Sequence, residues 1–242
     1  MKLSEAVRGV SGTLAADGEF SCIAFATEQE QSQFLTFLEK EKFLPALDNS
    51  KISCVLTTSA LAEKIPPHIK GVFLCDRPKA ALFEIHNRLA RHPDYVGASA
   101  ATVVGEGCSI SPLAAIDCEN VVIGDRVTIE PFVVIKGRVI IGNDVTIRSG
   151  AVIGCKGFSF SKDAQGQNVS VEDTARIIIE DHVEIFEQVA ISTGIFPWEE
   201  TRIGENTKVD AQCHIGHGAH IGRNCLLAEG SRCCGNSRVG DH

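Results

Sequence analysis

An apolar residue recurs at every sixth position between Val104 and Val239, and this spacing restricts the possible folds more than any other feature of the chain. Neither an α-helix, with a period of 3.6 residues, nor a lone strand, with a period of two, repeats in this way. So short a repeat is typical of a solenoid of parallel β-coils, in which each coil buries its apolar side against its neighbours. The repeat positions are Val104, Ile110, Ile116, Ile123, Ile129, Ile135, Ile141, Ile147, Ile153, Ile179, Ile185, Ile191, Ile203, Val209, Ile215, Ile221, Leu227, Cys233 and Val239.

A second inward position is predicted four residues after each apolar residue, because a small or β-branched side chain recurs there, as at Val127, Val145 and Ala219. One large and one small inward residue per hexad fit a narrow prism that side chains fill. Three hexads make one triangular coil, so about twenty hexads give a prism roughly 30 Å long. Glycine often follows the apolar residue, as at Gly124 and Gly204. We interpret these glycines as corner residues that need a positive φ.

Residues 1–98 lack the hexad and are predicted to form a separate α/β domain, with residues 99–242 forming the coils. The segments 20–26, 52–58 and 71–75 are typical of short buried strands. The segment 78–91 is typical of a helix that starts with proline. His86 and His92 lie on or just beyond this helix, and both are interpreted as solvated or capping residues.

Composition excludes several classes of protein. No run of 18 apolar residues is present, so no transmembrane segment is expected. The first ten residues lack an apolar signal core, which favours a cytoplasmic protein. The net charge is −8, and residues 99–200 hold the surplus with 7 basic and 15 acidic side chains, which argues against nucleic acid as a partner. The ten cysteines form no Cys-x-x-Cys motif and are expected to be reduced.

The hexads resemble those of the hexapeptide-repeat acyltransferases, and this resemblance alone implies a left-handed parallel β-helix. The whole order of parts is similar to one branch of that superfamily, the UDP-3-O-acylglucosamine N-acyltransferases of lipid A biosynthesis. Four stretches carry the similarity, and the first and last are the most specific. They are FLTFLEKEKF (34–43), GVFLCDRPKAALFEIHNRLA (71–90), GCKGFSFSKDAQG (154–166) and KVDAQCHIGHGAHIG (208–222).

The first of these stretches implies a uridine-binding role for the N-terminal domain. In the family it supplies two aromatic rings that sandwich the uracil, and the matching positions are Phe37 and Phe43. Stacking on a flat base contributes roughly 1–3 kcal/mol. The family usually has Asn-Pro between the two rings, where this chain has Lys40 and Glu41, so the contact with the sugar differs here. Burial of both phenylalanines in the core is the alternative.

The motif around His217 implies the chemistry. Aligned on the family pattern, His217 is the catalytic base, Asp210 orients it, and Gly235 supplies the oxyanion N–H across a subunit boundary. An imidazole is suited to removing the proton of an attacking amine at neutral pH. His214 and His220 flank His217, but the hexad is expected to place them at prism corners, pointing away from it. A metal site within one subunit is therefore not expected, while a metal shared between subunits and a merely solvated His217 remain alternatives.

The resemblance implies transfer of a 3-hydroxyacyl chain from acyl carrier protein to the 2-amino group of a UDP-3-O-acylglucosamine, in a homotrimer and without a cofactor. Acetyl-CoA-dependent acetylation of a UDP-amino sugar and a non-catalytic scaffold are the alternatives. Family members continue for several coils beyond the position of His242, so we expect either a fragment or a shortened relative.

Overall fold

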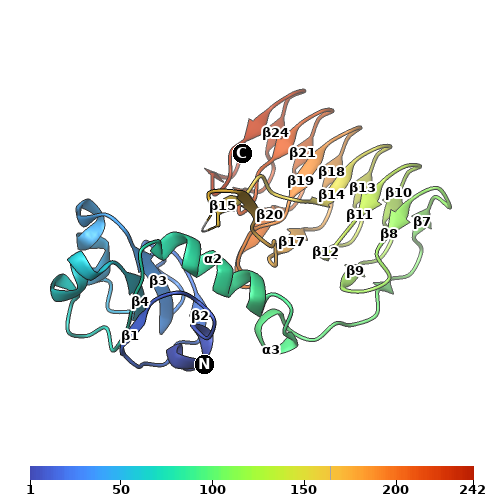
Figure 1. The fold of residues 1–242 in the computed structure, drawn as a ribbon. Coiled ribbons are helices and arrows are strands. Elements are labelled where there is room, and N and C mark those ends of the chain that lie inside the picture. Colours follow the sequence, from blue (N-terminus) through green and yellow to red (C-terminus); the bar gives the residue numbers. More distant parts are fainter. Residues whose placement is uncertain (164) are drawn as a thin grey trace. The chain divides into compact units, whose positions relative to one another are not determined.

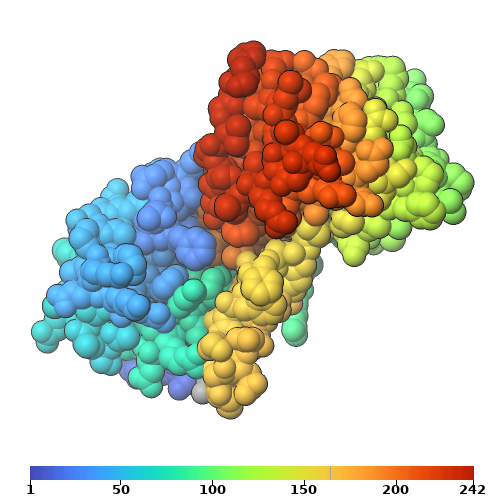
Figure 2. All heavy atoms as spheres, turned by 90° about the horizontal axis from the view of Figure 1, so that it is seen from above, coloured from blue at the N-terminus to red at the C-terminus, as the bar shows by residue number. Residues whose placement is uncertain are grey.

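The computed structural model describes residues 1–163 and 165–242. The chain divides into two compact units. The first consists of residues 1–96 together with the segment 159–172, and the second of residues 97–158 and 173–242. The second unit carries the hexads, and in Figure 1 its coils follow one another in chain order. In the space-filling view the same coils form a continuous surface from green to red (Figure 2).

The second unit is a parallel β-helix with three faces, each of which is one parallel sheet. The first face contains β7 (Ser109–Ile110), β10 (Thr128–Ile129), β13 (Thr146–Ile147), β18 (Glu184–Ile185), β21 (Lys208–Val209) and β24 (Leu226–Leu227). The second face contains β8 (Ala115–Ile116), β11 (Val134–Ile135), β14 (Val152–Cys155), β19 (Ala190–Ser192), β22 (His214–Ile215) and β25 (Arg232–Cys233). The third face contains β6 (Val103–Val104), β9 (Val121–Ile123), β12 (Arg138–Ile141), β17 (Arg176–Ile179), β20 (Glu200–Ile203), β23 (His220–Ile221) and β26 (Arg238–Val239).

The register between coils confirms the predicted coil of three hexads. Ile129 pairs with Ile147, and Ile215 pairs with Cys233, each 18 residues further on. The apolar positions and the small positions four residues later fill one core, which includes Val127 and Val145 at 0% exposure. Two insertions interrupt the hexads, and they lengthen the step from Ile141 to Ile179 and from Ile179 to Ile203.

The glycines that follow the apolar residues have a different role from the predicted one. Gly124 and Gly204 do not have a positive φ. A Cβ on Gly124 would lie 2.6 Å from the carbonyl oxygen of Gly142, so close stacking of backbones excludes a side chain. Positive φ occurs two residues later at the corner, where Arg126 and Asn206 adopt it. The prediction that the corner glycines need a positive φ is therefore wrong for these two.

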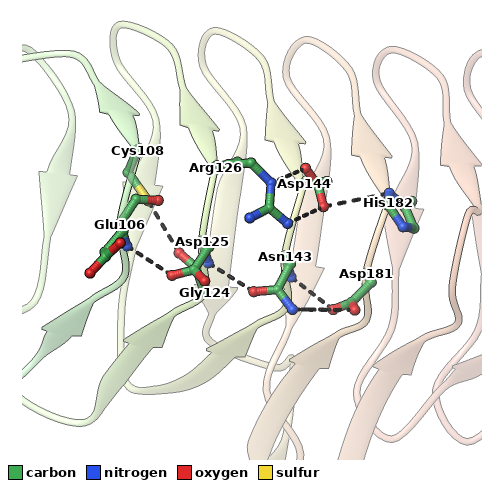
Figure 3. A network of polar contacts seen from close by, with 9 residues as sticks. All are labelled: Glu106, Cys108, Gly124, Asp125, Arg126, Asn143, Asp144, Asp181 and His182. Atoms are coloured by element: carbon green, nitrogen blue, oxygen red, sulfur yellow. Dashed lines mark hydrogen bonds and ion pairs between the residues drawn. The ribbon is translucent and has the colours of Figure 1, made fainter.

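One corner carries a column of side chains that connects successive coils (Figure 3). Asp125 accepts the Glu106 N–H at 2.8 Å, and Asn143 accepts the Asp125 N–H at 2.9 Å. Asp181 accepts the Asn143 N–H at 2.8 Å. Each side chain thus satisfies a backbone donor of the preceding coil, which fixes the register of the stack.

The first unit is an α/β domain around one mixed sheet, with strand order β1-β5-β4-β3-β2. Strands β2 to β5 are parallel and β1 is antiparallel to β5. The sequence analysis predicted a strand at three of these positions and missed β1 and β3. The elements are α1 (Leu3–Ala6), β1 (Thr13–Ala16), β2 (Cys22–Ile23), β3 (Phe34–Leu38), the 3-10 helix η1 (Glu41–Asp48), β4 (Ile52–Thr57), the 3-10 helix η2 (Ser59–Lys64), β5 (Gly71–Leu74), α2 (Pro78–Leu89) and α3 (Pro93–Val96).

Helix α2 packs against β3 and β4 and confirms the predicted helix. His86 on this helix is 0% exposed, so its predicted solvated or capping role is wrong. Its Nδ1 lies 3.0 Å from the Tyr95 hydroxyl, and its Nε2 lies 2.8 Å from the Glu172 carbonyl oxygen. Burial lowers the pKa of His86, so the ring is held neutral. His92 is exposed, as predicted.

The antiparallel hairpin β15 (Phe160–Lys162) and β16 (Asn168–Ser170) belongs to the first unit, although it interrupts the hexads. The Asn87 side chain donates to the Ser170 carbonyl oxygen at 2.8 Å and accepts the Glu172 N–H at 2.9 Å. A division at residue 98 therefore does not describe where this segment packs. Along the described residues, no helix combines the length and the apolarity that crossing a membrane requires.

Candidate active site

The outward positions of the β-helix change character along its axis. On the second and third faces the residue before each buried aliphatic points outward, because side chains alternate along a strand. These residues are apolar in the first four coils and basic in the last. The second-face column is Ala115, Val134, Val152, Ala190, His214 and Arg232. The third-face column is Val103, Val122, Ile140, Ile178, Arg202, His220 and Arg238.

The first face differs, because its outward column is mainly polar. It contains Ser109, Thr128, Thr146, Glu184, Lys208 and Leu226. The corner between the second and third faces is thus flanked by two columns that change from apolar to basic at the same end of the β-helix. His217 lies on this corner, between β22 and β23.

The three histidines of the HIGHGAH segment occupy different positions from those predicted. His217 lies in the corner turn, whereas His214 and His220 lie in β22 and β23 and point outward from the two flanking faces. The reason is that each strand consists of the buried aliphatic and the residue before it. The three rings thus diverge, as predicted, although the corner belongs to His217. The His220 Nε2 lies 3.1 Å from the Glu200 carbonyl oxygen.

The imidazole of His217 lies directly over Gly235 of the same chain. A Cβ built on Gly235 would lie 2.4 Å from Nε2, 2.7 Å from Cε1 and 2.8 Å from Cδ2 of this ring. The sequence analysis placed these residues on stacked coils, and the structure brings them into contact within one chain. The Gly235 N–H has no hydrogen-bond acceptor among the described residues, so it is free to donate.

Hydrogen bonds fix the corner that carries His217. The Asn236 N–H donates to the His217 carbonyl oxygen at 2.8 Å, and the Gly218 N–H donates to the Thr201 hydroxyl at 2.9 Å. Arg238 Nη1 donates to the Gly218 carbonyl oxygen at 2.7 Å. Within the described parts of the chain, His217 Nδ1 is buried and has no hydrogen-bond partner. The nitrogen beside Gly235 is Nε2, which is therefore the candidate base.

Asp210 is not near His217 within one chain. It follows β21 at the corner between the first and second faces, whereas His217 lies at the next corner. Its carboxylate accepts the Ala211 N–H at 2.7 Å. An interaction of Asp210 with the imidazole thus has no support from the geometry of a single chain.

The titratable groups around this corner favour proton transfer over metal binding. Burial lowers the pKa of His220, and the charge of Arg238 lowers it further. His220 is therefore held neutral beside His217. Among the described residues, no group of three or more His, Cys, Asp or Glu side chains is arranged to hold a metal ion.

Phe37, Lys40 and Phe43 lie in the first unit. Phe37 at the end of β3 is half-buried, and its ring meets Phe25 edge-to-face with centroids 6.5 Å apart. Phe43 on η1 is 55% exposed, and Lys42 Nζ lies 4.8 Å from its ring centroid. Lys40 is exposed at the start of η1. One ring is thus partly in the core and the other presents its surface to solvent.

Comparison with known proteins agrees with this architecture. The family model described as bacterial transferase hexapeptide (six repeats) matches residues 120–155 and 200–235, and the second stretch contains His217 and Gly235. A UDP-3-O-acylglucosamine N-acyltransferase from Bradyrhizobium sp. (strain BTAi1) is 29% identical over 239 residues, which cover 84% of this chain and 64% of the relative. The chain is a homologue of these hexapeptide-repeat acyltransferases.

Two further relatives support the same assignment. A UDP-3-O-acylglucosamine N-acyltransferase from Coxiella burnetii is 28% identical over 251 residues, which cover 93% of this chain and 72% of the relative. The solved UDP-N-acetylglucosamine acyltransferase from Campylobacter jejuni matches with a TM-score of 0.51 and 25% identity, over 58% of this chain and 52% of that chain. The chain thus spans 64% of the Bradyrhizobium homologue and 72% of the Coxiella one.

Sequence reasoning missed two residues that shape the corner of this homologue. Arg238 lies 18 residues after His220 and thus on the next coil, so the coil length was a sufficient signal for its place. Thr201 is 0% exposed, and its hydroxyl donates to the Ser192 carbonyl oxygen at 2.9 Å. Its position depends on the inserted loop before β20, whose length breaks the hexad, so no sequence signal marked it.

Proposed function

We propose that this chain is an N-acyltransferase, which moves a 3-hydroxyacyl chain from acyl carrier protein to the 2-amino group of a UDP-3-O-acylglucosamine in lipid A biosynthesis. The observation that carries the proposal is the corner at which His217 Nε2 lies over Gly235. Homology to acyltransferases that act on such an amino sugar supports the choice of substrate. Cytoplasmic acyl donors fit a reaction in the cytoplasm.

The corner residues suit transfer from a thioester to an amine. The neutral amine nitrogen attacks the thioester carbonyl carbon, and His217 Nε2 accepts the proton that the nitrogen loses. The carbonyl oxygen becomes negative in the tetrahedral intermediate, and the unpaired Gly235 N–H stabilises it. When the C–S bond breaks, the imidazolium returns the proton to the leaving thiolate. The amide and the free thiol are the products.

The outward columns beside His217 support a long-chain acyl donor. Val134 and Val152 on the second face, and Ile140 and Ile178 on the third, offer apolar surface along the axis. His214 and Arg232 continue the second-face column beyond His217. An acyl chain fits the apolar coils, and an anionic carrier fits the basic ones. For the nucleotide, the exposed ring of Phe43 supports stacking on uracil.

A homotrimer is part of the proposal. Each β-helix has two flat faces with apolar outward columns and one with a mainly polar column. Three identical prisms that bury the apolar faces close around a three-fold axis and leave the polar faces in water. Burial of Ile140, which is 39% exposed in the single chain, is favoured in such an assembly.

A transfer assay with two donors tests the proposal. We expect the purified chain to transfer a 3-hydroxyacyl group from acyl carrier protein to the 2-amino group of the UDP-sugar, with mass spectrometry identifying the new amide. Acetyl-CoA is expected to react far more slowly, because an acetyl group leaves the apolar columns empty. A preference for acetyl-CoA would support acetylation of a UDP-amino sugar, and no reaction with either donor would support a binding scaffold.

A further inference from the structure

The place of Gly235 beneath His217 is the most restrictive contact at the candidate site. The three ring atoms Nε2, Cε1 and Cδ2 all lie within 2.8 Å of the point where a Cβ would stand. Carbon and nitrogen atoms that are not bonded normally approach to about 3.5 Å. The imidazole therefore occupies the space of a missing side chain.

The backbone at Gly235 does not itself require glycine. Its φ lies outside the left-handed region. Side chains occur at the equivalent position of this corner on other coils, at Cys118 and Thr193 and at His217 itself. At another corner Asp125 occupies the equivalent position and bonds to the preceding coil. The only close neighbour that a side chain at Gly235 would meet is the imidazole of His217.

We propose that Gly235 is a positioning residue, which seats the imidazole of His217 in its own chain by having no side chain. This inference rests on the proposed function and adds to the role of the Gly235 N–H. The ring and the oxyanion donor then lie on stacked coils of one chain, roughly 5 Å apart along the axis. The resemblance to relatives implied a donor across a subunit boundary, and the contact in this chain supports the opposite arrangement.

Gly235→Ala tests the seat because it retains the backbone N–H. The added methyl group displaces the flexible ring rather than the backbone, so the variant is expected to fold normally. A displacement of the base by about 1 Å lowers kcat by on the order of 10²-fold. KM for either substrate is expected to change little, because the ring binds neither tightly.

Gly240→Ala is the matched control. Gly240 also lies at a corner of the last coil, its φ is outside the left-handed region, and a Cβ there would have no atom within 4 Å. We expect this variant to retain the activity of the unmodified chain. Unchanged kcat in Gly235→Ala would overturn the proposal.

Mixing two inactive variants separates the two arrangements. Chains carrying His217→Ala and chains carrying Gly235→Ala are unfolded together and refolded into mixed assemblies. If each site takes both residues from one chain, the mixture stays as inactive as its parents. Recovery of activity would show that the two residues act across chains and would refute the seat within one chain.

A measurement without turnover keeps this inference separate from the proposed function. We expect a nuclear Overhauser contact between the His217 Hε1 proton and the Gly235 Hα protons, because a Cβ on Gly235 would lie only 2.7 Å from Cε1. The His217 ring signals should shift in Gly235→Ala and stay in place in Gly240→Ala. Absence of the contact would refute the seat even if the chain were an active acyltransferase. Its presence in an inactive chain would support the seat and count against the proposed activity.

Discussion

At the scale of single residues, Phe43 offers the clearest test of nucleotide binding. Its ring is 55% exposed, so removing it costs the fold little. Stacking on a base contributes roughly 1–3 kcal/mol. We expect Phe43→Ala to raise the Kd for UDP by about 5- to 150-fold, measured by calorimetry.

Phe132 provides the matched control for this measurement, because it is 66% exposed and lies at a corner of the β-helix. Phe132→Ala should leave the Kd for UDP unchanged. Equal affinities of the Phe43→Ala variant and the unmodified chain would exclude Phe43 from the binding site.

Glu200 makes stability depend on pH. Its carboxylate lies 2.7 Å from Arg202 Nη2 and 2.6 Å from Arg176 Nη2. Burial opposes ionisation, but hydrogen bonds from Arg202 and Arg176 outweigh it and lower the pKa of Glu200. A group with a lowered pKa stabilises the fold above its ordinary pKa, and this stabilisation is lost as the pH falls through the lowered value.

Glu200→Gln is therefore expected to lower the free energy of unfolding at neutral pH by about 1–2 kcal/mol. The difference from the unmodified chain should shrink in acid, because the carboxyl is then protonated in both states of the unmodified protein. Urea unfolding at neutral and acid pH measures it. Glu205→Gln is the control, since the exposed Glu205 carboxylate makes no hydrogen bond in the described part of the chain. A difference that persists unchanged in acid would contradict this account.

What the sequence could predict at this scale depends on whether the hexad determines a residue's surroundings. The burial of Ile185 and Val145 follows directly from their position in the repeat, and it was predicted. The burial of His86 was not, because its partner Glu172 lies in an insertion far along the chain. The contact between His217 and Gly235 needed the coil length and also the direction of the ring, and only the structure shows the direction.

At the scale of elements, the corner glycines decide how closely the coils stack. A Cβ on Gly124 would lie 2.6 Å from the Gly142 carbonyl oxygen, and neither backbone can move without breaking the ladder. Overpacking of this kind costs about 1–3 kcal/mol. We expect Gly124→Ala to lower the free energy of unfolding by this amount, whereas Gly240→Ala should be neutral. Equal thermal stability of the two variants would contradict the stacking argument.

The β-helix was predictable from sequence because its period is set by local geometry that each coil repeats. The N-terminal sheet was less so, since its strands are short and continuous apolar runs do not distinguish strand from helix. The segment 34–38 is such a run, and it became β3 because parallel neighbours pair with both of its edges. The hairpin of β15 and β16 carries no hexad and no strong strand signal, so its pairing could not be predicted.

At the scale of the whole molecule, the two apolar columns predict where copies of the chain associate. Ile140 is an exposed apolar residue on the third face, while Thr128 lies on the mainly polar first face. Ile140→Asp places a charge in the proposed interface and should shift the assembly from trimer to monomer in sedimentation velocity. Thr128→Asp should remain trimeric. A monomeric unmodified chain, or a trimer that tolerates Ile140→Asp, would rule out this interface.

The central claim is that His217 is the base of an acyl transfer, and replacing it is the most direct test. A general base contributes typically 10²–10⁴-fold to the rate. We predict that His217→Ala lowers kcat for transfer from acyl carrier protein by this factor, while circular dichroism and the Kd for UDP stay unchanged. His214→Ala, on the neighbouring strand, should lose far less. Activity of His217→Ala close to that of the unmodified chain would contradict the account.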